Sequence, residues 1–130
     1  MRTAILSAFL FALSGAAYAQ PSSAEPQLIE IGLSNFKFRP STINLQHGQG
    51  YRLHFVNRAD GGHDFVAKTF FSQARIDPGD AAKVKGGRIE LKGGQSTYVT
   101  LTPQTPGTYK VHCSHFMHST FGMTGQIVVT

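Results

Sequence analysis

The feature that most constrains this chain is a run of donor side chains between residues 113 and 123. Its single cysteine opens the sequence Cys113-Ser-His-Phe-Met-His118-Ser-Thr-Phe-Gly-Met123. Four residues separate the cysteine from His118, and four more separate His118 from Met123. Tyr109 and Val111 precede the cysteine with the alternation of a β-strand, which turns Cys113 to the same side as these apolar residues. Cys113 is therefore expected to point into the core at the end of a strand.

These side chains are metal donors, and the chain offers one more of them upstream. A second imidazole, His63, stands in the sequence Gly61-Gly-His63-Asp-Phe. One thiolate, two imidazoles and a weak axial thioether are the ligands of a blue-copper site. Sulfur donors suit Cu(I) and imidazole also suits Cu(II), so such a site serves both oxidation states. We predict one type 1 copper ion, bound by His63, Cys113, His118 and Met123, that carries single electrons.

The same residues resemble the cupredoxin family, which includes plastocyanin, azurin and pseudoazurin. In that family one ligand histidine follows a strand in the first half of the chain, and a Cys–His–Met loop joins the last two strands. Here His63 follows the sequence Phe55-Val-Asn57, and the ending Gly122-Met-Thr-Gly-Gln-Ile-Val-Val is similar to the closing strand of the family. The resemblance covers most of the chain after residue 19. It implies a Greek-key β-sandwich and an electron carrier that is not an enzyme.

The rest of the sequence also predicts an all-β fold. Short apolar or alternating segments separated by Gly, Pro and Asn are typical of a β-sandwich. We expect about seven or eight strands, with segments at 28–33, 36–38, 42–45, 51–56, 98–101, 109–113 and 125–130. Residues 66–94 fit this pattern least well. They predict a short helix over 69–76, a turn at 77–80, and either an irregular segment or a strand over 83–91.

Residues 1–19 have the features of a secretory signal. Arg2 precedes an apolar stretch over 4–13, and Ala17-Tyr-Ala19 is an A-x-A cleavage motif. We expect cleavage near Ala19 and export, with the periplasm as the destination. A flexible leader over 20–27 and one copper-binding domain over 28–130 would follow. The apolar stretch is shorter than the roughly 18 residues of a membrane span, so no transmembrane segment is expected.

Export makes the single cysteine more informative. One thiol cannot close an internal disulfide, and a free thiol is a liability in an oxidising compartment. A buried core cysteine and an intermolecular bridge are the alternatives to a metal ligand. The spacing from Cys113 to His118 and Met123 favours the ligand.

The chain has six histidines, of which the predicted site needs two. Three others fall in a turn or on outward strand positions and are interpreted as solvated surface residues: His47, His54 and His112. His115 is the competitor of His118 for the metal. We prefer His118, because using His115 would leave seven residues before Met123.

Two neighbours of His63 bear on the site. The carbonyl of Gly62 could approach the metal opposite Met123, because glycine permits a close backbone approach; an ordinary turn is the alternative. Asp64 stands where many cupredoxins carry an asparagine that ties the two ligand loops together. A carboxylate accepts a backbone N–H bond but lacks the amide donor, so this departure puts the usual bracing in question.

The surface suggests how a partner is met. His118 is expected near the surface, ringed by Phe116, Met117 and Phe121, which form an electron port or alternatively pack under the loop. The formal net charge is +5, or +4 once Arg2 is removed, and the basic excess lies within 68–92. A basic face steers acidic proteins, so we expect an acidic redox partner such as a cytochrome or a reductase. An ordinary solvated surface is the alternative.

Other classes of function are less well supported. The charge excess is modest and no recognition motif is present, so nucleic acid is not an expected partner. The protein is expected to be a monomer. A copper-delivery protein without electron transfer would use the same residues, but a thiolate inside a sandwich favours retention of the metal. A zinc site of His63, Cys113 and His118 could support hydrolysis. It lacks a well-placed carboxylate base, and thioether is a poor zinc ligand.

Overall fold

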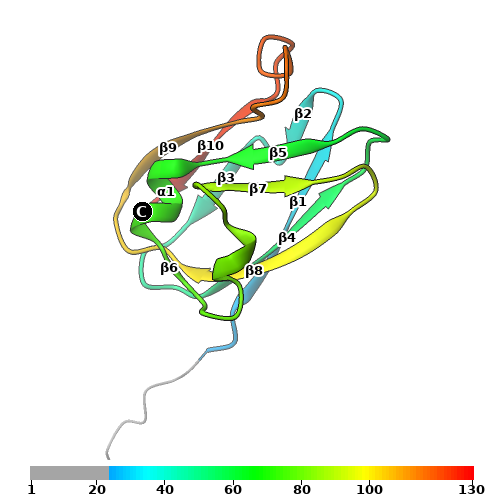
Figure 1. Ribbon diagram of the computed structural model, residues 1–130. Coiled ribbons are helices and arrows are strands. Elements are labelled where there is room, and N and C mark those ends of the chain that lie inside the picture. Colours follow the sequence, from blue (N-terminus) through cyan, green and yellow to red (C-terminus); the bar gives the residue numbers. More distant parts are fainter. Residues whose placement is uncertain (1–23) are drawn as a thin grey trace, which may run out of the picture.

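A computed structural model describes residues 24–130, which form two five-stranded β-sheets facing each other (Figure 1). In the first sheet the strand order is β2 (Lys37–Arg39), β1 (Gln27–Ser34), β4 (Tyr51–Asn57), β8 (Ser96–Thr102) and β6 (Arg75–Ile76). In the second sheet the order is β3 (Thr42–Leu45), β10 (Thr124–Val129), β9 (Gly107–His112), β5 (His63–Val66) and β7 (Arg88–Leu91). The predicted all-β sandwich is confirmed.

The pairing of the strands fixes which segments meet at the site. β1 runs parallel to β4 and β10 runs parallel to β3, whereas the other pairs are antiparallel. β5 pairs with β7 over its whole length, from His63 opposite Leu91 to Val66 opposite Arg88. It meets β9 at one registered pair, Val66 opposite His112. The second sheet therefore has a narrow junction between β5 and β9.

Alternating side chains explain why these segments bury one face each. On β4, Tyr51, Leu53 and Phe55 are buried, and the residues between them are not. On β9, Tyr109 and Val111 are buried while Lys110 and His112 are exposed. Phe55 and Phe65 meet edge to face between the sheets, with ring centroids 5.0 Å apart. The alternation that was predicted for 51–56 and 109–113 is therefore present in the structure.

The segment over 66–94 differs from its prediction in detail. The short helix is α1 (Lys68–Gln73), which buries Phe70 and Phe71. It ends before Ile76 because Arg75 and Ile76 extend to pair with β8. A 3₁₀ turn, η1 (Ala81–Lys83), precedes β7. Among the described residues the sandwich has ten strands rather than the predicted seven or eight, since the short strands β5 and β6 were not anticipated.

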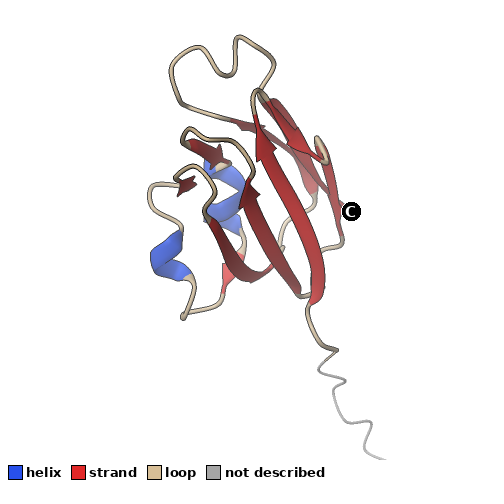
Figure 2. Ribbon diagram, turned by 90° about the vertical axis from the view of Figure 1, so that its right-hand side faces the viewer, coloured by secondary structure: helices blue, strands red, loops and turns tan. Residues whose placement is uncertain are grey.

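The two ends of the sandwich are unequal. Figure 2 shows that long loops project from one end, whereas the chain enters at the other. β1 begins at Gln27, one residue before the predicted first strand, and the predicted signal over 1–19 lies outside the described residues. Among residues 24–130, no helix combines the length and the apolar character needed to cross a bilayer.

Candidate metal centre

Cys113 reaches the interior because it continues the inward side of β9. Its side chain is fully buried, and those of Val111 and Tyr109 before it are also buried. The backbone N–H of Cys113 donates to the carbonyl of Met123 at 3.1 Å, which closes the loop between β9 and β10. The N–H of Met123 in turn donates to the carbonyl of His118 at 3.0 Å. The loop is thus held at its two ends and at His118.

His63 is the first residue of β5 and is fully buried. The turn that leads to it is anchored by the buried Asn57, whose amide donates to the carbonyls of Gly61 at 2.9 Å and Lys92 at 3.0 Å. The side-chain oxygen of Asn57 accepts a hydrogen bond from the backbone N–H of Ala59 at 3.0 Å. His63 therefore enters the core from a turn whose backbone is fixed on both sides.

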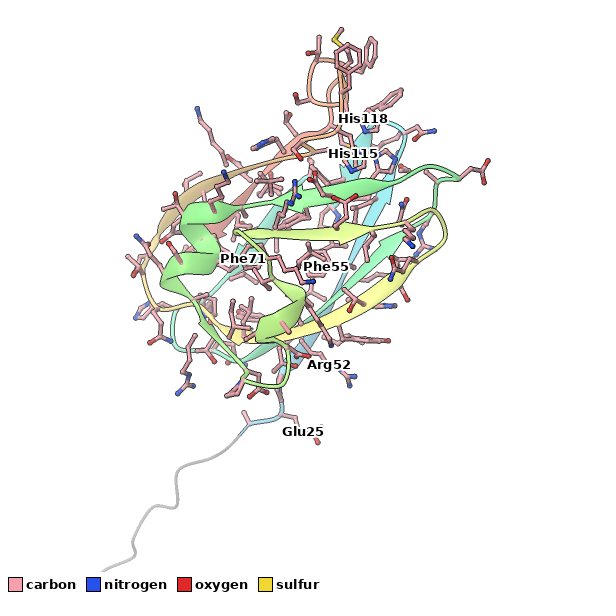
Figure 3. All side chains as sticks on the ribbon, viewed as in Figure 1. Glu25, Arg52, Phe55, Phe71, His115 and His118 are labelled. Carbon is pink, nitrogen blue, oxygen red and sulfur yellow. The ribbon has the colours of Figure 1, made fainter. Side chains whose placement is uncertain are left out.

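Three predicted donors come together at the top of the sandwich. The Nδ1 atoms of His63 and His118 lie 3.1 Å apart. The Sγ of Cys113 is 3.4 Å from Nδ1 of His118 and 3.8 Å from Nδ1 of His63. These atoms come from the start of β5 and from the β9–β10 loop, which Figure 3 shows above the second sheet.

The distances fit a single ion. At zinc sites, metal–nitrogen bonds are about 2.0–2.1 Å and metal–sulfur bonds about 2.3 Å, so one ion can join nitrogens up to about 4.1 Å apart and a nitrogen and a sulfur up to about 4.4 Å apart. All three separations, from 3.1 to 3.8 Å, lie within these limits. Two imidazoles and one thiolate are the equatorial donors of a type 1 copper site.

Met123 is also fully buried and is joined to Cys113 and His118 through its backbone. The preceding Gly122 has φ +103°, a backbone conformation that favours glycine. The structure therefore puts Met123 in the interior directly after the loop turns. Its role as the weak axial ligand stays a prediction.

The orientation of His63 depends on a residue that the sequence did not single out. The Nε2–H of His63 donates to Oδ1 of Asn35 at 2.9 Å, from the turn between β1 and β2. This bond leaves the lone pair of Nδ1 directed at Cys113 and His118. A ligand histidine fixed through its second nitrogen is typical of metal sites. Asn35 lies 28 positions before His63 in the sequence, so no local pattern pointed to this partner.

Burial keeps His63 and Cys113 neutral in the metal-free protein. Burial lowers the pKa of His63 below its ordinary value, and the nearby His118 and His115 lower it further. Burial raises the pKa of the Cys113 thiol. Without a metal the thiol therefore stays protonated and His63 stays uncharged near neutral pH. A metal cation has to displace the thiol proton, so metal affinity is expected to rise with pH.

His115 lies close to His118, but its side chain contacts Glu90 rather than the donor cluster. Its Nε2 is 2.7 Å from Oε1 of Glu90, and its ring stacks on that of His118 with centroids 5.4 Å apart. Figure 3 shows the two histidines next to each other at the base of the loop. A Cβ on Gly62 would lie 3.1 Å from Cε1 of His115, so glycine leaves room for this ring. The role of the Gly62 carbonyl as a ligand stays a prediction.

Asp64 braces the two ligand segments in spite of lacking an amide. Its Oδ1 accepts the N–H of Ser114 at 2.6 Å, and its Oδ2 accepts the Ser114 hydroxyl. The carboxylate is fully buried, and Nη1 of Arg88 lies 3.6 Å from Oδ2. The serine hydroxyl supplies a donor that suits a carboxylate, and Arg88 offsets its charge. The doubt about bracing is therefore resolved by two residues that the sequence did not single out.

Exposed apolar side chains lie in the loop that carries His118 and in the turn that contacts it, and His118 is itself half-buried. Phe116 is 90% exposed and Phe121 60%, so these rings do not pack under the loop. Phe36, from the β1–β2 turn, meets the ring of His118 edge to face at 4.9 Å. We call the set Phe36, Phe116, Met117 and Phe121 the apolar rim. Phe36 was not singled out in the sequence, and the role of this set as an electron port stays a prediction.

Comparisons with known proteins agree with this architecture. A family model described as a cupredoxin-like domain matches residues 3–129. Reduced auracyanin from Roseiflexus castenholzii is 23% identical, with a TM-score of 0.59, covering 82% of this chain and 99% of that chain. Auracyanin A, a "blue" copper protein from Chloroflexus aurantiacus, is 21% identical with a TM-score of 0.58, covering 82% and 100%.

A multicopper oxidase, McoA from Aquifex aeolicus, shares the fold with a TM-score of 0.64 at 15% identity. The match covers 91% of this chain but only 32% of the oxidase. Comparison with curated proteins found no match. At such low identities the likeness to the solved structures establishes the sandwich and its connectivity.

Proposed function

Because this chain belongs to the family of cupredoxin-like domains, whose model matches almost all of it, we propose that it binds one copper ion and carries single electrons between redox partners. The ligands are His63, Cys113, His118 and Met123. The observation that carries the proposal is the meeting of one thiol and two imidazole nitrogens within 3.8 Å of one another in the interior.

Bound copper supplies a one-electron Cu(I)/Cu(II) couple. The protein contributes a donor set that changes little between the two states. Cys113 and Met123 are fixed by the closure of the β9–β10 loop, and His63 is fixed by Asn35. Because these three donors are held by a strand or a hydrogen bond, little reorganisation is expected to accompany the gain or loss of an electron.

His118 is the route by which electrons leave. It is the one half-buried member of the three donors, and Phe36 of the apolar rim packs against its ring. Small interfaces suit brief redox encounters. An apolar contact over this imidazole brings a partner close to the site and excludes water, while leaving the complex free to dissociate.

We further propose that the protein is exported as a monomer and is not an enzyme. Export is supported by the signal-like features of residues 1–19, with cleavage near Ala19. The absence of catalysis is supported by the burial of His63, Cys113 and Met123, which keeps three of the four predicted ligands away from solvent. The same burial favours retention of copper over its delivery to another protein.

A metal titration tests the copper proposal. Addition of Cu(II) is expected to produce an intense visible band that saturates at one ion per chain, because the thiolate donates charge to Cu(II). Addition of Zn(II) should produce no visible band, and prior loading with Zn(II) should delay the colour. Binding of copper without an intense band would argue against a copper–thiolate bond and for a different metal role.

A salt titration tests the expected acidic partner. Charge steering weakens as the screening length falls, to about 8 Å at physiological ionic strength. The exposed Lys92 lies near the metal centre, because it follows Leu91, which pairs with His63. Arg75 serves as the control, because it belongs to β6 on the other sheet. Lys92→Glu is expected to slow association with an acidic cytochrome several-fold at low salt, as measured by stopped flow. Arg75→Glu should have little effect.

The same experiment distinguishes the alternatives. Lys83 is unsuitable as a probe because it donates to Asp80 and to the carbonyl of Tyr98, and Arg88 is unsuitable because it faces Asp64. Rates that stay flat with salt, with equal behaviour of Lys92→Glu and Arg75→Glu, would leave the apolar rim as the recognition element. The basic residues would then be an ordinary solvated surface.

A further inference from the structure

A second concave site lies on the outer face of the second sheet, beside the metal centre. It is a pocket of about 720 Å³, bordered by β5, β7, β9 and the start of α1. The helix and the strands β5 and β7 face the viewer in Figure 1. Its lining includes Val66, Lys68, Arg88, Lys110, His112 and Ser114.

Sheet register explains why the basic side chains converge there. Lys110 and His112 occupy the outward positions of β9, since Tyr109 and Val111 point inward. Val66 pairs with His112 on one side and with Arg88 on the other. These three residues therefore form one row across the sheet, with Val66 as the apolar floor.

Lys68 completes the cluster from the helix. Gly87, with φ +74°, allows the start of β7 to approach Lys68 so closely that a Cβ would lie 2.6 Å from the Lys68 Cα. This approach puts Lys68 next to Arg88 at the mouth of the pocket. Thr69 and Thr108 add hydroxyl groups to the lining.

The pocket is positive and largely uncompensated. No carboxylate lines it, and in residues 24–130 neither Lys68 nor Lys110 forms an ion pair. Arg88 contacts the buried Asp64 at 3.6 Å, and that carboxylate is already occupied by two bonds from Ser114. Glu90, the next outward residue of β7, is paired with His115. The positive charges of Lys68, Lys110 and Arg88 are therefore not balanced by an equal number of nearby carboxylates.

We propose that this pocket binds a small oxyanion, a phosphate or carboxylate group carried by a low-molecular-weight compound. Lys68, Lys110 and the half-exposed Arg88 provide charge and donors for the anionic group, and the threonine hydroxyls provide further polar contacts. A volume of about 720 Å³ exceeds the needs of a bare ion and falls in the range of sites for small organic molecules. Val66 supplies apolar surface for the body of such a compound.

The anion site is connected to the metal centre through named contacts. An oxyanion beside Arg88 competes with Asp64 for the guanidinium group, and Asp64 holds the backbone N–H and the hydroxyl of Ser114. Ser114 follows Cys113 directly. Occupation of the pocket is therefore expected to be sensed at the Ser114 amide, and the inference does not depend on the identity of the metal.

Amide NMR titration with inorganic phosphate tests this site in the full chain at constant ionic strength, both metal-free and loaded with Cu(I). Saturable shifts are expected at Lys68, Lys110, His112 and Ser114, with a dissociation constant in the millimolar range. The double variant Lys68→Gln/Lys110→Gln should weaken binding about tenfold, since each exposed charge contributes a factor of a few. The matched double variant Lys37→Gln/Arg39→Gln removes two charges from β2 and should leave binding unchanged.

Three outcomes overturn the proposal. Shifts that grow linearly without saturation, or an equal loss in both double variants, would show that phosphate senses only the net charge. Shifts of the same amides by a short glutamate peptide, with none caused by phosphate, would show that the pocket is a contact for acidic protein side chains. Both double variants change exposed residues, and circular dichroism checks that each is folded.

Discussion

Replacement of Cys113 by serine is expected to abolish the intense visible band of the copper-loaded protein completely. Sulfur is the charge-transfer donor, and a serine oxygen cannot replace it. Loss of an outer hydrogen-bond partner alone typically costs about 10–100-fold in metal affinity, so loss of the thiolate should cost more. Absorption spectra and competition with a copper chelator measure the two effects.

The fold is expected to survive this change. Cys113 is fully buried, and an unsatisfied hydroxyl at its position should lower the free energy of unfolding of the metal-free protein by about 1–3 kcal/mol. Urea unfolding followed by circular dichroism gives this value. Met117→Leu changes a partly exposed sulfur in the same loop and serves as the control, which should keep the band. A band that persists in Cys113→Ser would exclude the copper–thiolate assignment.

The second large effect concerns the choice between two neighbouring histidines. His118→Ala is expected to remove the native band, because Nδ1 of His118 lies 3.4 Å from the Cys113 sulfur and 3.1 Å from Nδ1 of His63. Since His118 is half-buried, added imidazole should enter the vacated position and restore part of the absorption.

His115→Ala is the matched comparison. This change removes the contact with Glu90 and the stacking on His118, but takes no donor from the cluster of His63, Cys113 and His118. The band should keep its intensity and shift slightly at most. If His115→Ala loses the band and His118→Ala keeps it, the order of ligands in the loop is wrong.

Periodicity and spacing predicted a large part of this molecule. The alternation of Tyr109, Val111 and Cys113 indicates which way the thiol points, because side chains on a strand alternate by geometry. The spacing to His118 and Met123 defines a loop short enough to return to the same place. Both the alternation and the spacing involve residues that are close together in the chain, so they can be recognised in a single sequence.

The supporting residues were beyond the reach of such signals. Asn35 contacts His63 from a turn 28 residues away, and His115 meets Glu90 across 25 residues. β5 is buried at all four positions, so it shows no alternation from which a strand could be predicted. Arg88 resembled any surface cation until the pairing of β5 with β7 brought it to Asp64. These contacts depend on which turns of the sandwich meet.

The narrow junction between β5 and β9 gives the donors a mechanical meaning. Within the described residues the two strands share one registered pair, Val66 and His112, so the second sheet is easiest to part along this line. His63 stands on one side of the line, and Cys113 and His118 stand on the other. An ion bound by all three residues would cross-link the two sides of this junction. The hydrogen bonds from Ser114 to Asp64 cross the same junction beside it. Removal of the ion is therefore expected to lower the resistance of the sheet to opening along this line.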